Sequence, residues 1–117
     1  HIAKEYFKQS EYKDRIITHL GNGLDIIPKI NKKFQLAFID ADKENYSQYF
    51  DLIIDKMDIG GVIIADNVLW SGKVLEEKKD KETTELFNFN NKIQSHKRVE
   101  NLLLPVRDGL MICRKIN

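Results

Sequence analysis

The stretch that decides the fold is "FQLAFIDADKENY", residues 34–46. The run from Phe34 to Ile39 is almost wholly apolar, which is typical of a strand buried on both faces of a sheet. It ends at Asp40, and Asp42 and Lys43 follow within three residues. The polar residues are either a solvated loop after a strand or the beginning of an acidic pocket for a cation.

The residues after this stretch predict a helix and then a second strand. Apolar and aromatic residues recur at helical spacing from Lys43 to Met57, and Gly60-Gly61 is expected to stop that helix. The next stretch, "VIIADNV" at residues 62–68, is again apolar and ends in the polar pair Asp66 and Asn67. The chain therefore contains two buried strands that both end in polar side chains.

The remaining segments complete an alternation of helices and strands. Before the first stretch, we expect a helix over "IAKEYFKQ" (2–9), a strand over "RIITHL" (15–20) closed by the turn Gly21-Asn22-Gly23, and a short helix over "LDIIPKI" (24–30). After the second strand, we expect an exposed loop from Ser71 that runs into a helix capped by Thr83 or Thr84. The chain then ends in two apolar runs that flank the hairpin turn Arg107-Asp108-Gly109. This order predicts one α/β domain over residues 1–117, a parallel sheet of four or five strands with a final antiparallel hairpin.

The two polar strand ends should meet in space. In a parallel sheet with right-handed crossovers, neighbouring strands bring their carboxyl ends to the same edge. Asp40, Asp66 and Asn67 are therefore expected to converge, with Asp42 close by. Carboxylate and amide oxygens are ligands for hard cations such as Mg²⁺, Mn²⁺ or Ca²⁺. The competing interpretation is that these residues only cap helices, which suits Asp42 well.

Composition excludes several classes of function. Lysine plus arginine number 19 and aspartate plus glutamate 18, so a net charge of +1 gives no electrostatic reason for binding nucleic acid or an anionic membrane. Cys113 is the single cysteine, and it indicates a reducing, cytoplasmic setting without an internal disulfide. No apolar stretch is long enough to span a bilayer.

Three stretches together resemble a known family: "FIDADKENYSQYFD", "GGVIIADNVLWSGKV" and "LPVRDGLMICRK". They are similar in register to the cation-dependent O-methyltransferases of the catechol and caffeoyl-coenzyme A type, class I enzymes that use S-adenosylmethionine. The resemblance implies a Rossmann-like sheet and transfer of a methyl group to a hydroxyl of a small catechol-like phenol. It also implies a homodimer.

The resemblance also implies roles for individual residues. The metal ligands would be Asp40, Asp66 and Asn67, with Mg²⁺ as the expected ion; the cofactor contacts would be Gly23, Asp40 and Asp42; the catalytic residues would be Lys43, beside the reacting hydroxyl, and Asp40; and the substrate loop would begin at Trp70 and Ser71. From the residues alone, Lys43 could equally be a solvated first-turn lysine, and Trp70 a surface or interface residue.

Two features of the family are missing from these residues. No glycine-rich cofactor loop and no ribose-binding acid precede the first stretch, so we expect the chain to be the C-terminal portion of a methyltransferase domain, without its first two strands. Such a portion should bind S-adenosylmethionine weakly and should self-associate. The alternative function is a non-catalytic module whose acidic crevice binds a cation or a partner, and a phosphohydrolase-like acidic pocket is a weaker third interpretation.

Overall fold

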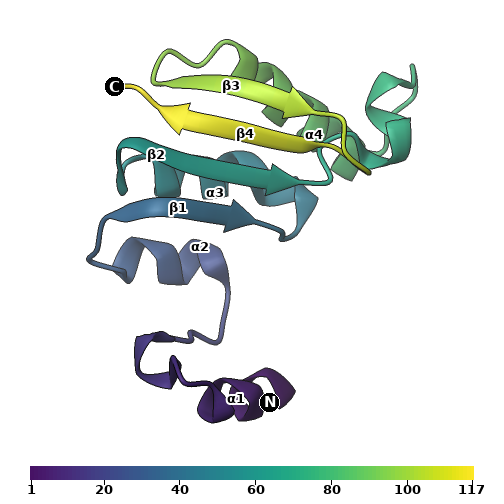
Figure 1. The fold of residues 1–117 in the computed structure, drawn as a ribbon. Coiled ribbons are helices and arrows are strands. Elements are labelled where there is room, and N and C mark those ends of the chain that lie inside the picture. The colour runs from purple at the N-terminus through teal and green to yellow at the C-terminus, as the bar shows by residue number, and fades with distance from the viewer.

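The structure is a computed structural model that describes residues 1–117 (Figure 1). Its strands are β1 (Phe34–Ile39), β2 (Met57–Asp66), β3 (Val99–Leu104) and β4 (Leu110–Lys115). Its α-helices are α1 (Ile2–Gln9), α2 (Gly23–Ile26), α3 (Tyr46–Ile54) and α4 (Lys81–Gln94), and its 3₁₀ turns are η1 (Lys13–Arg15), η2 (Ile27–Lys29), η3 (Lys43–Asn45) and η4 (Trp70–Leu75). None of the helices is long and apolar enough to cross a lipid bilayer.

The four strands form one sheet in the order β1-β2-β4-β3. Strands β1 and β2 pair in parallel, whereas β4 pairs antiparallel with both β2 and β3. This arrangement confirms the predicted α/β fold with a final antiparallel hairpin. Because Ile39 pairs with Ala65, the next residues, Asp40 and Asp66, leave neighbouring strands at the same edge.

One face of the sheet carries the hydrophobic core. Helices α3 and α4 lie behind the sheet in Figure 1 and pack against its strands. Phe50 and Phe89, one from each helix, are fully buried and meet edge to face at 6.3 Å between ring centroids. They pack with Ile63 and Met111 of the sheet in one cluster. Each such side chain contributes about 1.5–3 kcal/mol through burial, so this layer holds the strand ends in place.

The opposite face of the sheet is uncovered, so the expectation that the first strand is buried on both faces is wrong. Phe38 pairs with Ile64, Ile64 with Ile112, and Ile112 with Leu102. These four side chains, the apolar row, cross all four strands, and Phe38 and Leu102 are 60% and 57% exposed. No helix of the chain packs on this face, because both long helices belong to the other one (Figure 1).

The segment "RIITHL" does not form the strand expected of it. Residues 16–20 have no regular secondary structure, and they connect η1 to α2. Three β-branched residues favour an extended chain, but a strand also needs a neighbour that supplies backbone hydrogen bonds. The sheet ends at β1 on this side, and residues 16–20 do not pair with that edge strand.

Two predicted helix boundaries are also corrected. The helix predicted from Lys43 to Met57 begins as the 3₁₀ turn η3 and ends at Ile54, and Gly60-Gly61 lies within β2. A Cβ at Gly61 would lie 2.8 Å from the Asp58 carbonyl oxygen, so this glycine permits a close packing contact.

Helix α4 is capped by Asp80, and not by Thr83 or Thr84 as predicted: Asp80 Oδ1 accepts a hydrogen bond from the Thr83 amide at 2.8 Å. An aspartate satisfies a free amide of the first turn as well as a threonine does.

Candidate active site

The carboxyl ends of β1 and β2 form the candidate site, as the sequence predicted. The Asp40 side chain is 57% exposed, and Asp66 is half-buried. Asp66 Oδ1 accepts a hydrogen bond from the Asn67 amide at 2.7 Å. Asn67 itself has φ of 60°, a left-handed conformation that asparagine tolerates better than most residues. The chain thus turns sharply at the residue predicted as the third metal ligand.

The turn of the β3–β4 hairpin forms backbone hydrogen bonds with the loop that follows β2. The Val68 amide donates to the Gly109 carbonyl at 3.2 Å, and the Leu69 amide donates to the Asp108 carbonyl at 2.8 Å. From α4, Asn90 Nδ2 donates to the Val68 carbonyl at 2.8 Å. Sequence reasoning missed these contacts, since it interpreted residues 107–109 only as a hairpin turn. Backbone pairing between two loops leaves no periodic signal in a sequence.

Lys43 is buried at this edge and is not a solvated first-turn lysine. The residue is 6% exposed, and its Nζ donates to the Tyr46 hydroxyl and, at 3.4 Å, to the Asp66 carbonyl. Asp40 Oδ1 lies 3.7 Å from Nζ, and the Trp70 ring centroid lies 5.6 Å away. A buried ammonium group is costly unless polar partners surround it, and here they come from both strand ends.

Opposing influences act on the Lys43 ammonium. Burial lowers its pKa, because the charged form loses hydration, while the carboxylates of Asp40, Asp66 and Asp108 raise it. The net direction is downward from the ordinary lysine pKa of 10.5. Burial also raises the pKa of Tyr46, so its hydroxyl stays protonated. Asp108 is therefore a third carboxylate near Lys43, which the sequence did not assign to the site.

Two of the three residues predicted to contact the cofactor line a common cavity, and the third, Asp42, does not line it. A cavity of about 340 Å³ is lined by Gly23, Asp40 and Tyr49, among others. A Cβ at Gly23 would lie 2.9 Å from a Tyr49 ring carbon, so this glycine allows α2 to approach α3. The Tyr49 hydroxyl donates to Asp42 Oδ1 at 2.7 Å. Tyr49 thus connects the predicted cofactor residues, a role that its core-facing helical spacing did not reveal.

The hydrogen bond between Tyr49 and Asp42 changes both acidities. It lowers the pKa of Asp42, because the phenol donates to the charged carboxylate. Burial, together with the same contact, raises the pKa of Tyr49 to about 12. Asp42 therefore remains charged near neutral pH.

Trp70 and Ser71 begin η4, directly after the strand end. Both have left-handed φ values, 48° and 54°. Two lysine ammonium groups lie near the Trp70 ring, with Lys43 Nζ at 5.6 Å and Lys73 Nζ at 5.9 Å from its centroid. The structure thus brings Trp70 to Lys43, while Ser71 is exposed and makes no side-chain hydrogen bond.

The donor set at the strand ends fits a hard cation. The chain has no group of three or more histidine, cysteine, aspartate or glutamate side chains placed to hold a metal ion. A cation at this edge would be held by the carboxylates of Asp40 and Asp66 and the amide oxygen of Asn67. Oxygen donors of this kind suit Mg²⁺ or Mn²⁺, which keep several water ligands, better than Zn²⁺.

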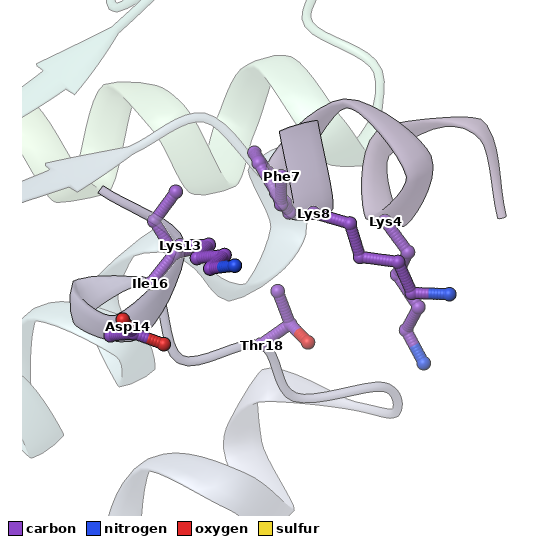
Figure 2. Close-up of a pocket in the computed structure, with 7 residues that line it drawn as sticks. All are labelled: Lys4, Phe7, Lys8, Lys13, Asp14, Ile16 and Thr18. Atoms are coloured by element: carbon purple, nitrogen blue, oxygen red, sulfur yellow. The ribbon is translucent and has the colours of Figure 1, made fainter. Parts of the chain in front are cut away.

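A second cavity lies far from these residues, between α1 and the segment that follows it (Figure 2). Lys4 and Lys8 of α1 and Lys13 of η1 line it, together with Phe7. All four side chains are exposed. None of the predicted site residues lies there, so the strand-end edge remains the candidate site.

Comparison with known proteins identifies the family of the chain. An O-methyltransferase family model matches residues 1–116. Tricin synthase 2 from Oryza sativa subsp. japonica is 41% identical over 98% of this chain and 46% of its own length. Catechol O-methyltransferase domain-containing protein 1 from Mus musculus is 32% identical, with the same coverage of both chains. The chain thus spans about half the length of these relatives.

A solved structure shares the whole arrangement. The O-methyltransferase from Bacillus cereus in complex with SAH superposes with a TM-score of 0.88 and 29% identity, covering 97% of this chain and 57% of that one. The chain therefore has a Rossmann-like methyltransferase fold. With the family model matched over nearly every residue, the chain belongs to the O-methyltransferase family.

Proposed function

We propose that the full-length protein transfers a methyl group from S-adenosylmethionine to a hydroxyl of a catechol-like phenol, with the help of a divalent cation. The observation that carries this proposal is the buried Lys43 ammonium at the carboxyl ends of β1 and β2. It lies within 3.7 Å of Asp40 Oδ1 and 3.4 Å of the Asp66 carbonyl oxygen. An amine held beside a carboxylate and a backbone carbonyl at the strand ends is placed to act on the proton of a metal-bound hydroxyl.

The chain supplies the groups around the reacting oxygen. When bound, the cation would lower the pKa of a phenolic hydroxyl, and S-adenosylmethionine would supply the methyl group and leave as a neutral thioether. Lys43 Nζ would take up the hydroxyl proton or stabilise the phenolate by its charge. Asp40 and Asp66 would fix the direction of approach, since alignment of the reacting atoms supplies much of the rate.

The proposed substrate class rests on two supports. Two carboxylates and one amide oxygen leave coordination positions free, and two neighbouring phenolic hydroxyls would fill two of them. Relatives carry names that refer to caffeoyl-CoA and catechol O-methyltransferases. The Trp70 ring, 5.6 Å from Lys43 Nζ, offers an aromatic surface on which a planar phenol could stack.

A methyl-transfer assay tests the proposal. The full-length protein, with S-adenosylmethionine and catechol or caffeoyl-CoA, should form a methylated product in Mg²⁺ or Mn²⁺, lose that activity in chelator and regain it on return of the metal. Full activity in chelator would contradict the cation requirement. If the protein binds the metal but forms no methylated product in its presence, the non-catalytic acidic module would be favoured instead.

A further inference from the structure

The hydroxyl of Tyr46 lies at the centre of the site, although no substrate could touch it. Tyr46 is the first residue of α3 and is 0% exposed. Its hydroxyl accepts a hydrogen bond from Lys43 Nζ and donates to the Asp66 carbonyl at 2.8 Å. A single phenol therefore links the buried lysine to the backbone of the neighbouring strand end.

These contacts decide where the Lys43 ammonium points. An ammonium group has three hydrogens to donate. The Tyr46 hydroxyl and the Asp66 carbonyl take two of them, and Asp40 Oδ1, 3.7 Å from Nζ, lies on the remaining side. The first two partners face the protein interior, whereas the Asp40 side chain is 57% exposed. The lysine thus presents its free side to the open edge of the sheet.

The tyrosine is itself held rigidly. Its ring meets the Phe89 ring of α4 edge to face, with 5.5 Å between centroids and an angle of 81°. Lys43 Nζ lies 4.4 Å from the Tyr46 ring centroid, a further attraction between cation and ring. A phenylalanine would fill the same space in this packing. The hydroxyl is therefore not needed to fill the core, and burying it is unfavourable unless it makes hydrogen bonds.

We propose that Tyr46 is a positioning residue for methyl transfer, whose hydroxyl holds Lys43 Nζ against the end of β2 and directed at the reacting hydroxyl. This rests on the proposed function, since it assigns a purpose to Lys43 within that reaction. Lys43 has four rotatable side-chain bonds, and the Tyr46 hydroxyl fixes the end of that chain. Without it, Nζ would keep only the longer contacts, with the Asp66 carbonyl at 3.4 Å and with Asp40 Oδ1 at 3.7 Å.

A double-mutant cycle in the full-length protein tests the assignment. Tyr46→Phe should lower kcat about tenfold or more and leave the KM for S-adenosylmethionine unchanged, because misplacement of a reacting group affects the transition state. In a Lys43→Ala background, the same Tyr46→Phe change should lower kcat by less than about twofold, because the group it positions is absent. An equal fall in both backgrounds, or no fall in the parent, would overturn the proposal.

Phe50→Leu provides the matched control for packing. It removes a fully buried ring that packs on Phe89 at 6.3 Å between centroids but keeps the Tyr46 hydroxyl and the ring contact of Tyr46 with Phe89. We expect it to lower the Tm at least as much as Tyr46→Phe while kcat stays within about twofold of the parent. If instead the loss of kcat follows the loss of Tm in both variants, the hydroxyl has only a structural role and the proposal fails.

A structural readout separates this proposal from the proposed function. If the parent protein does not methylate any phenol in the presence of metal, the proposed function fails, but the position of Lys43 can still be measured. A crystal structure of the full-length Tyr46→Phe variant should then show Nζ displaced from the Asp66 carbonyl. An unmoved Nζ would overturn the positioning role whatever the activity.

Discussion

The chain buries two lysines, and their partners distinguish a functional group from a structural one. Lys115 Nζ donates to two backbone carbonyls, those of Ile54 at 3.0 Å and Met57 at 2.9 Å. These carbonyls join α3 to β2, at the opposite end of the sheet from the candidate site. Lys43 instead faces a phenol, a carboxylate and an aromatic ring at the open edge. Lys115 therefore stabilises a connection, whereas Lys43 is available for chemistry.

Replacing each lysine should separate these roles. Lys43→Ala should lower kcat about 100-fold, in the range for loss of a group that acts on the proton, with little change in the KM for S-adenosylmethionine. Lys115→Ala should leave kcat near that of the parent and lower the free energy of unfolding by about 2–3 kcal/mol, because two buried carbonyls lose their donor. Steady-state kinetics and urea unfolding measure both. Unchanged turnover in Lys43→Ala would remove Lys43 from the mechanism.

The Tyr49 hydrogen bond predicts a defined dependence of stability on pH. Because the folded-state pKa of Asp42 is depressed, its contribution is fully present above the unfolded pKa, about 3.9. It is lost as the pH falls through the folded value. Tyr49→Phe should therefore lower the free energy of unfolding by about 0.5–1 kcal/mol near neutral pH, and parent and variant should converge below about pH 4.

Urea unfolding of parent and Tyr49→Phe at several pH values measures this difference. Asp42 is exposed, so solvent screening keeps the expected effect at the small end of the range. Tyr12→Phe serves as a control, since Tyr12 is 57% exposed and its ring hydroxyl has no hydrogen-bond partner. A difference between parent and Tyr49→Phe that stays constant or grows on acidification would show that Asp42 does not depend on this phenol.

Residues of the candidate site were predictable from the sequence where they directly follow a strand. They were not predictable where their role depends on a hydrogen bond to another part of the chain. Asp40, Asp66 and Asn67 come directly after apolar runs, and the parallel pairing of β1 with β2 places the first two side by side. Tyr46 and Tyr49 have the spacing of core residues, so their ring positions were foreseen but their hydroxyl partners were not. A hydrogen bond to another strand's carbonyl has no local pattern in the sequence.

At the scale of elements, the hairpin turn acts as a brace for the strand-end loop. Gly109 has φ of 81°, and a Cβ there would lie 2.6 Å from Leu69 Cγ. Its carbonyl accepts from the Val68 amide. The turn can approach the loop this closely only because residue 109 has no side chain. The brace should therefore support both the hairpin and the position of Asn67.

Gly109→Ala and Gly60→Ala test the brace as a matched pair. Both glycines have positive φ, 81° and 85°, but nothing lies within 4 Å of a Cβ at Gly60. Each variant should incur the left-handed backbone cost of about 1–2 kcal/mol, and Gly109→Ala should lose a further 1–3 kcal/mol, roughly, through the clash with Leu69. Only Gly109→Ala should also weaken divalent-cation binding, because it displaces the loop that carries Asn67.

Urea unfolding and cation titration of both variants give these quantities. Equal destabilisation of the two variants would mean that the clash relaxes without cost. A normal cation affinity in Gly109→Ala would mean that the hairpin turn does not support the ligand loop.

Helices and strands were predictable where the local sequence pattern agrees with the strand pairing in the folded sheet. The hairpin around Arg107-Asp108-Gly109 and the helix over residues 2–9 are confirmed, since their signals are local. The prediction of a strand over "RIITHL" is wrong, because a strand needs backbone pairing and this segment does not pair with the edge strand β1. The helix end predicted at Gly60-Gly61 is wrong for a different reason: both residues lie in β2, where Gly61 permits a close contact with the Asp58 carbonyl.

For the whole molecule, the uncovered apolar row predicts self-association of the isolated chain. Phe38 is 60% exposed on a face that no helix of the chain covers. Phe38→Lys should raise the monomer fraction of the 117-residue chain in light scattering, because a charge on this face opposes burial. Leu75→Lys, at a residue 85% exposed in η4, should leave the fraction unchanged. A parent chain that is monomeric at all concentrations would contradict the prediction.

Mn²⁺ binding tests whether the carboxyl ends of β1 and β2 hold the divalent cation that we propose for methyl transfer. Electron paramagnetic resonance titration of the full-length protein should reveal one Mn²⁺ site. Asp66→Ala should weaken that site at least about tenfold, because it removes a charged ligand. Asp58→Ala changes the same charge at the opposite end of β2, where Asp58 accepts from Gln35 Nε2 at 2.6 Å, and should leave the affinity unchanged. Mn²⁺ binding that is absent from the parent, or equally strong in Asp66→Ala, would contradict the account.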